Sequence, residues 1–140
     1  MKKLRLYIVA LVLALATGTG VQAQVLRDAD FNAIGRISGN GVVRDAASRS
    51  IGSFDDDGTV RDKAGPVLGR IARLEIFNAQ GDRIGYITSD GNVRDGSSQP
   101  LGNINLNDGK VTDAAHNTLG YARGIRVDWI ACYFLFDFFK

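Results

Sequence analysis

The stretch NVRDGSSQPLG (Asn92–Gly102) decides the fold, because close copies of it recur along the chain. VVRDAASRSIG occupies residues 42–52, and TVRDKAGPVLG occupies residues 59–69. In each copy the aspartate is followed seven residues later by a glycine. Self-similarity at a short fixed period is the sequence signature of a repeat architecture.

Six copies align on an anchor residue, an acidic or amide side chain that recurs every 16 to 18 residues: Asp28, Asp45, Asp62, Asn78, Asp95 and Asp113. The glycines that follow them are Gly35, Gly52, Gly69, Gly85, Gly102 and Gly120. Aliphatic side chains stand two positions before every anchor and one position before every glycine. A further apolar column lies two positions after the glycine. These columns predict about six structurally equivalent units.

Each unit predicts two short strands joined by a tight polar turn. β-Branched Val and Ile fit a pleated, half-buried surface. The anchor oxygen can accept the backbone N–H two residues later and so fix the turn. Asn78 replaces the carboxylate without disturbing the other columns, so the position needs an acceptor rather than a charge.

The recurring glycine falls inside the second strand of each unit, where a glycine weakens pairing. Its recurrence predicts a β-bulge or a close backbone approach. A bulge would turn the apolar residues at one position before and two positions after the glycine toward the same core.

A second kind of turn joins one unit to the next. The pairs Asn40-Gly41, Asp57-Gly58, Asp90-Gly91 and Asp108-Gly109 predict two-residue primed turns. ARLEIF, at residues 72–77, lacks a glycine and predicts a longer strand or an irregular corner. No segment after residue 23 shows sustained helical periodicity.

The fold class expected from these features is all-β, a closed radial repeat of short antiparallel hairpins with strands of about four to six residues. Closure removes the exposed strand edges that an open array would have to protect. The repeat, the N-terminal leader and the aromatic tail resemble the bacterial β-flower proteins, small secreted repeat proteins with pseudo-rotational symmetry. The resemblance covers Val25–Lys140 and implies a flower of hairpin petals, with no established activity.

Residues 1–23 are predicted to be a signal peptide that is cleaved after Ala23. A basic start, MKKLR, precedes an apolar run from Leu6 to Ala16 and the small-residue site VQA. The protein is therefore expected in the periplasm, the cell envelope or the extracellular space. The chain has 17 Lys and Arg against 15 Asp and Glu, and removing the three basic residues of the leader leaves 14 against 15. This balance gives no case for nucleic acid as a partner.

The repeat domain spans residues 24–126, and residues 127–140 are expected to form a C-terminal apolar strand. DWIACYFLFDFFK would be apolar on both faces, which favours burial. The strand would close the ring or fill its axis, with Cys132, the one cysteine, as a small buried side chain. Contact of the tail with a membrane or a partner is the alternative that is not favoured.

The candidate ligand contacts form a column directly before the anchors: Arg27, Arg44, Arg61 and Arg94. On a closed ring they could bind phosphate or acidic sugars, or they could be exposed and balanced by nearby acids. The DDDG stretch at residues 55–58 lacks calcium-loop spacing and is interpreted as a solvated turn. The four aromatic residues Phe31, Phe54, Tyr86 and Tyr121 are too scattered along the sequence for the paired aromatics of glycan-binding repeats.

Three functional hypotheses remain open. The first is a non-enzymatic structural or interaction module of the bacterial envelope, with an envelope protein or glycan as partner. The second is a binding module for an anionic glycan or small ligand through the arginine column, and a variant of the first attaches to the envelope by the tail. A hydrolase using His116 is least supported. No sequence motif predicts a catalytic residue, a cofactor or a metal site.

Overall fold

The computed structural model describes residues 24–140, and the predicted signal peptide lies outside them. The described chain forms twelve strands and one helix. The first six strands are β1 (Gln24–Asp28), β2 (Ala33–Ile37), β3 (Val42–Asp45), β4 (Ser50–Phe54), β5 (Thr59–Asp62) and β6 (Val67–Ala72). The remaining elements are β7 (Glu75–Asn78), β8 (Arg83–Ile87), β9 (Asn92–Asp95), β10 (Pro100–Ile104), β11 (Lys110–Asp113), β12 (Thr118–Tyr121) and the helix α2 (Val127–Phe134).

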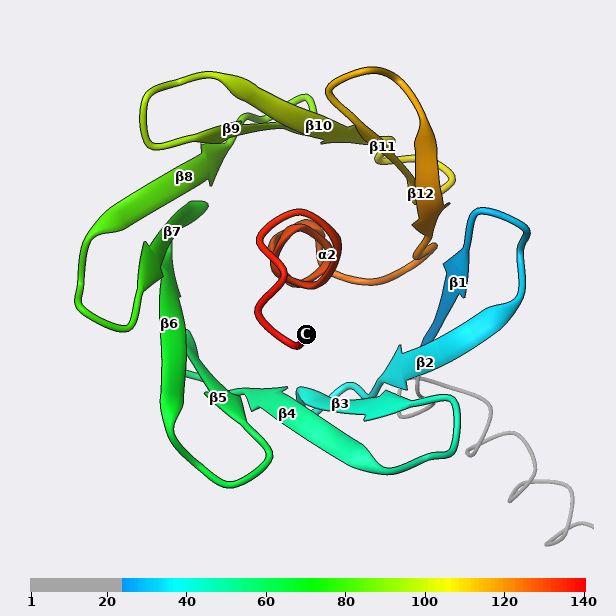
Figure 1. The fold of residues 1–140 in the computed structure, drawn as a ribbon, viewed down its shortest axis with the longest axis vertical. Coiled ribbons are helices and arrows are strands. Elements are labelled where there is room, and N and C mark those ends of the chain that lie inside the picture. Colours follow the sequence, from blue (N-terminus) through cyan, green and yellow to red (C-terminus); the bar gives the residue numbers. More distant parts are fainter. Residues whose placement is uncertain (1–23) are drawn as a thin grey trace, which may run out of the picture.

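The twelve strands close into one antiparallel ring around α2, as Figure 1 shows. Each strand pairs with its sequence neighbours, and β1 pairs with β12 through Arg27 opposite Tyr121. We call each anchor-centred hairpin a petal; the six petals are β1–β2, β3–β4, β5–β6, β7–β8, β9–β10 and β11–β12. The expected all-β closed radial repeat of about six units is confirmed.

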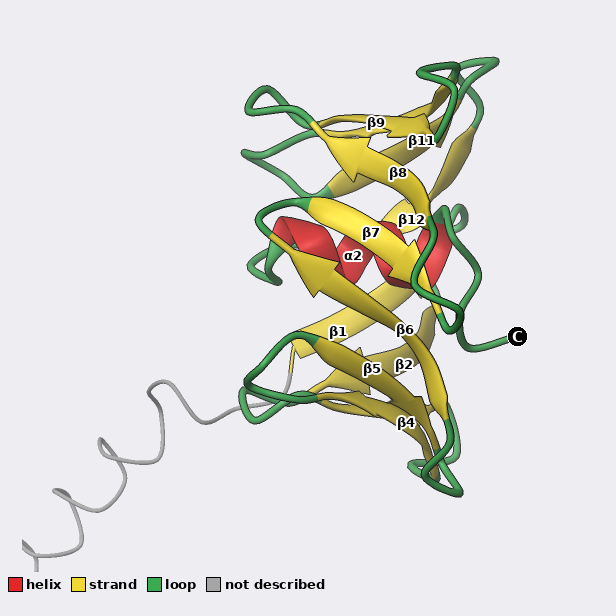
Figure 2. Ribbon diagram, turned by 90° about the vertical axis from the view of Figure 1, so that its left-hand side faces the viewer, coloured by secondary structure: helices red, strands yellow, loops and turns green. Residues whose placement is uncertain are grey.

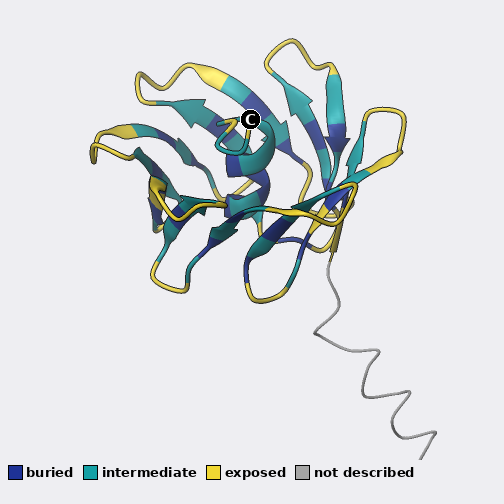
Figure 3. Ribbon diagram, turned by 60° about the horizontal axis from the view of Figure 1, so that its bottom comes forward, coloured by how far each residue is buried: buried dark blue, intermediate teal, exposed yellow. Residues whose placement is uncertain are grey.

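The glycine bulge is confirmed in every petal. In the first petal Leu26 faces Gly35 while Arg27 faces Ala33, so Ile34 is the extra residue. The same register shift recurs in the other five petals. As a result, the extra aliphatic residues pack against the core formed by the columns before the anchor and after the glycine. Figure 3 shows this burial concentrated near the axis, with the outer turns exposed.

The prediction of a C-terminal strand is wrong, because Val127–Phe134 form an α-helix that lies along the axis of the ring (Figures 1 and 2). Its location along the axis agrees with one of the two locations expected for this segment, the other being closure of the ring. A segment buried on all sides is apolar all round, so its periodicity does not separate a helix from a strand. Twelve strands also enclose more space than strand side chains alone fill, and the helix occupies it.

The tail residues pack on the recurring glycines. A Cβ built on Gly85 would lie 2.5 Å from Cζ of Phe136, and one on Gly120 would lie 2.6 Å from Cε1 of Phe134. The pattern continues round the ring, with Leu135 on Gly102, Phe138 on Gly69 and Phe139 on Gly52. Successive tail side chains therefore step from one petal to the next, and the close approach expected at the glycine column is made to the tail as well as to the neighbouring strand.

The turns between petals differ from the expected two-residue primed turns. Gly41 has positive φ and Asn40 does not, and the N–H of Gly41 donates to Ser38 O at 2.9 Å. These bonds define a three-residue loop closed by a left-handed glycine, which recurs at Gly58 and Gly91. At Gly109 the loop is one residue longer, because its N–H donates to Asn105 O at 2.9 Å.

The glycine-free stretch at residues 72–77 holds the primed turn instead. Arg73 and Leu74 have φ of 53° and 68°, and Ala72 pairs directly with Glu75. The strand β6 is six residues long and reverses there without an irregular corner. A two-residue loop of this kind requires positive φ at both positions, which the surrounding ring imposes on two non-glycine residues.

Candidate functional site

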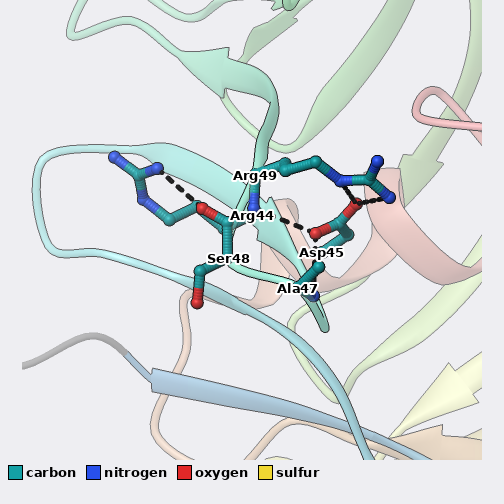
Figure 4. A network of polar contacts seen from close by, with 5 residues as sticks. All are labelled: Arg44, Asp45, Ala47, Ser48 and Arg49. Carbon is teal, nitrogen blue, oxygen red and sulfur yellow. Dashed lines mark hydrogen bonds and ion pairs between the residues drawn. The ribbon is translucent and has the colours of Figure 1, made fainter.

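Each petal ends in an outer turn built on its anchor, shown for the second petal in Figure 4. Asp45 Oδ1 accepts the backbone N–H groups of Ala47 at 2.9 Å and Arg49 at 3.0 Å. The Arg49 guanidinium adds an ion pair to Asp45 Oδ2 at 3.0 Å. Ser48 lies at the left-handed position of the turn with φ 67°. The anchor therefore organises the turn through backbone groups.

All six anchors accept the N–H two residues later. Five also accept the N–H four residues later. The exception is Asp62, since Pro66 has no N–H to donate. Asn78 makes both bonds with its amide oxygen, so the position requires an acceptor and no charge.

The backbone donors also stabilise the ionised form of several anchors. The pKa of Asp45 lies below its ordinary value, first because Arg49 N–H bonds the carboxylate. The pKa values of Asp28 and Asp113 are lowered in the same way, first by the N–H groups of Asn32 and Asn117.

The side chains of the arginine column form hydrogen bonds with the same outer turns. The Nη1 groups of the four residues donate to the carbonyl oxygen four positions later, at 2.9–3.1 Å: Arg27 to Phe31, Arg44 to Ser48, Arg61 to Gly65 and Arg94 to Ser98. Arg61 also bonds Asp55 at 2.8 Å. Each arginine thus lies on a different petal and holds the left-handed residue of its own turn.

A pocket of about 370 Å³ lies where the ring closes, between β1, β12 and the Asp108 loop. We call it the ring-closure pocket; its lining residues are Val25, Arg27, Phe31, Asp108, Tyr121 and Arg123. The rings of Phe31 and Tyr121 meet edge to face with centroids 5.1 Å apart. The guanidinium carbon of Arg27 lies 4.5 Å from the Phe31 centroid. The pocket thus combines two aromatic rings with two cationic groups and one carboxylate.

The interpretation of the aromatic residues as scattered is wrong for Phe31 and Tyr121. They belong to the first and last petals, and the pairing of Arg27 with Tyr121 at closure brings them together. One feature of the repeat distinguishes Phe31 and could have identified this pair from the sequence. Phe31 occupies the left-handed turn position that other petals fill with Ser48, Gly65, Gly81, Ser98 or His116, and it is 57% exposed.

A second pocket, of about 290 Å³, lies beside the start of α2 and is lined by the acidic stretch at residues 55–57. Asp128 is buried, and the Arg126 guanidinium binds its two carboxylate oxygens at 3.1 and 2.7 Å. Trp129 stacks on Phe54 at 5.0 Å. The ion pair therefore lies within the first turn of α2, and the Trp129–Phe54 contact joins α2 to β4 of the ring. Among residues 24–140, no group of three or more His, Cys, Asp or Glu side chains is arranged to hold a metal ion.

The one histidine and the one cysteine of the chain both lie at structural positions. His116 is exposed in the outer turn of the sixth petal, with φ 70°. Cys132 is buried in α2, as predicted, and burial raises the pKa of its thiol well above the ordinary value. In the part of the chain that the structure describes, no helix is long and apolar enough to cross a membrane.

Comparison with known families agrees with this geometry. The family described as 5-fold beta-flower protein matches residues 16–139. The chain belongs to this β-flower family. No curated protein and no solved structure matches the chain. The β-flower family is not a known class of enzyme. Its description states five-fold symmetry, whereas this β-flower chain has six petals in its described residues.

Proposed function

We propose that this β-flower protein is an exported, non-enzymatic interaction module of the bacterial envelope, with an envelope protein or glycan as its partner. The observation that carries the proposal is the set of six outer turns, which share one backbone frame and differ in side chains. Their first four residues read DADF, DAAS, DKAG, NAQG, DGSS and DAAH. The frame depends on the anchor and on the left-handed residue, so the other positions are free to vary.

The rigidity of the ring supports a binding role for the outer turns. Binding residues are commonly placed on loops that a rigid scaffold positions, and preorganised loops lose less conformational entropy on binding. Here the scaffold is a closed ring whose axis is filled by α2 and its aromatic side chains. Because the tail packs on the ring glycines, the outer turns are a better contact surface than the tail.

Site-specific photocrosslinking tests the module. A photoreactive amino acid is placed at Ala47 or at Ala64, both in outer turns, and a matched control carries it at Asn40, in a loop between petals. We expect a defined crosslinked envelope component from the two outer-turn positions and none from position 40. Equal crosslinking at all three positions, or none at the outer turns, would refute the proposal.

Export rests on the pattern of residues 1–23 and is tested separately. Mass spectrometry of the protein recovered from the cell envelope should show an N-terminus at Gln24. Recovery of the intact chain from the cytoplasm would remove the envelope from the proposal and leave the module itself to be tested by crosslinking.

A further inference from the structure

We propose that the ring-closure pocket binds an acidic sugar, a pyranose ring that carries a carboxylate. The inference rests on the proposed interaction module and names the ligand class for one site on it. The pocket volume of about 370 Å³ lies within the range of small-molecule sites. It accommodates one or two sugar rings of an acidic glycan.

The aromatic pair supplies the apolar face that a sugar needs. The C–H groups on one side of a pyranose ring form a flat apolar patch, which packs on an aromatic ring. Phe31 offers such a surface, because it is 57% exposed while its ring is held edge to face with that of Tyr121. Its φ of 69° is that of the left-handed position that all six outer turns share, so the turn frame holds the phenylalanine in place.

The charged groups supply the recognition of a carboxylate. Arg27 uses Nη1 to bond Phe31 O at 3.0 Å, and its other N–H groups are not engaged by that bond. Arg123 is exposed at the pocket wall. A guanidinium binds a carboxylate through two parallel hydrogen bonds. Two arginines against the single Asp108 give the pocket a net positive charge, which favours an acidic ligand over a neutral one.

Asp108 completes the polar lining. Its Oδ1 accepts the N–H of Lys110 at 3.0 Å, which fixes the orientation of the side chain. The second carboxylate oxygen can accept a hydrogen bond from a sugar hydroxyl group. The pocket thus presents acceptors as well as donors, as a ligand with both hydroxyl and carboxylate groups requires.

This combination belongs to the junction of the first and last petals. At the junction of the first and second petals, Ser48 takes the position of Phe31, and Arg36, which pairs with Arg44, takes the position of Tyr121. At the junction of the fourth and fifth petals, Tyr86 pairs with Arg94 as Tyr121 pairs with Arg27, but the turn beside it carries Ser98, whose hydroxyl bonds Tyr86 at 2.9 Å. The ring therefore has six turns of the same frame, of which the first alone places a phenylalanine against a tyrosine.

Titration calorimetry with three probes tests the proposal on the purified protein at physiological ionic strength. The probes are a galacturonic acid trimer, the neutral galactose trimer and benzoate. We expect the acidic trimer to bind at least tenfold more tightly than either of the other two. Comparable binding of the neutral trimer would refute recognition of the carboxylate, and comparable binding of benzoate would refute recognition of the sugar ring.

Variants then locate the site. Phe31→Ser introduces the residue that Ser48 and Ser98 provide in the same turn frame, so the fold should be kept. This change and Arg123→Ala should each weaken binding of the acidic trimer at least tenfold. The control Arg94→Ala removes an arginine with the same turn hydrogen bond in the fifth petal and should leave binding unchanged.

The possible results distinguish failure of the pocket inference from failure of the proposed interaction module. If Arg94→Ala weakens binding as much as Arg123→Ala, the arginine column and not the pocket is the contact, and the inference is wrong. If the acidic trimer does not bind while crosslinks still form at the outer turns, the pocket inference fails and the interaction module stands.

Discussion

Phe136 and Gly85 form a matched pair in which the glycine leaves the space that the phenylalanine ring fills. A Cβ at position 85 would lie 2.5 Å from Cζ of Phe136, and it would also meet the carbonyl oxygen of Arg94 on the adjacent strand. The glycine of the repeat therefore has two partners, one across the sheet and one on the axis. Its recurrence is explained by both.

We expect Gly85→Ala to lower the free energy of unfolding by about 3 kcal/mol, since neither the strand nor the packed tail can yield without cost. Urea denaturation followed by circular dichroism measures the change. Gly81→Ala is the control, because a Cβ added there would meet no atom within 4 Å beyond its chain neighbours, and only the strain of φ 91° is added. That strain costs about 1 kcal/mol. An equal loss in both variants would contradict the packing role of Gly85.

Removal of residues 127–140 should abolish the cooperative thermal transition seen by circular dichroism. The deletion uncovers the axial face of twelve strands and takes away the side chains that fill it. Deletion of Lys140 alone is the control, because this residue is exposed, and the transition should be kept. If the shortened ring melts as the full chain does, the axial helix is dispensable and its assignment to the core is wrong.

Asn78→Ala should lower the free energy of unfolding by about 1–2 kcal/mol, because the N–H groups of Gln80 and Asp82 lose their acceptor. Asn78→Asp supplies the same oxygen and should remain within about 0.5 kcal/mol of the parent chain. Guanidinium denaturation distinguishes the two. A larger loss in the aspartate variant than in the alanine variant would show that the fourth petal requires a neutral side chain.

Ser48→Gly should raise the free energy of unfolding by about 0.5–1 kcal/mol. Ser48 has φ 67°, a conformation that glycine adopts without strain. The hydrogen bond from Arg44 goes to the backbone carbonyl and is kept. Thermal unfolding provides the measurement, and Ser53→Gly, in a strand with ordinary φ, is the control that should destabilise the protein. A destabilised Ser48→Gly variant would contradict the strain assigned to this turn.

Acid should destabilise the petals through Asp28, Asp45 and Asp113. Their pKa values in the folded chain lie below the ordinary value of 3.8, so the ionised carboxylates favour folding. This contribution is complete above pH 3.8 and is lost as the pH falls through the lower folded pKa values. Replacing all three by Asn should flatten the dependence of the unfolding midpoint on pH below about 4. An unchanged slope would show that the acid sensitivity arises elsewhere.

The sequence by itself determined the repeat and most of the structural features that the repeat imposes. The anchor column predicted the turn bonds, because an Asx side chain acts on backbone groups only two to four residues away. The glycine column predicted the bulge, and the aliphatic columns identified the core, in which Leu26 and Val43 are fully buried. Closure was predicted from the edge problem of short strands, and β1 with β12 satisfies it. These are local or periodic features, and six copies of each reinforce the same conclusion.

Only the tertiary structure decided the features that occur once in the chain and are not repeated in every petal. The tail became a helix because the ring leaves an axial space, whereas its apolar residues fit a buried strand equally well. Phe31 and Tyr121 meet because the first and last strands pair, although their order along the chain separates them. The left-handed turn at Arg73 and Leu74 contradicts local preference and is held by the strands on either side. For the tail and for the Phe31–Tyr121 pair, the determining contact joins residues that no local pattern relates.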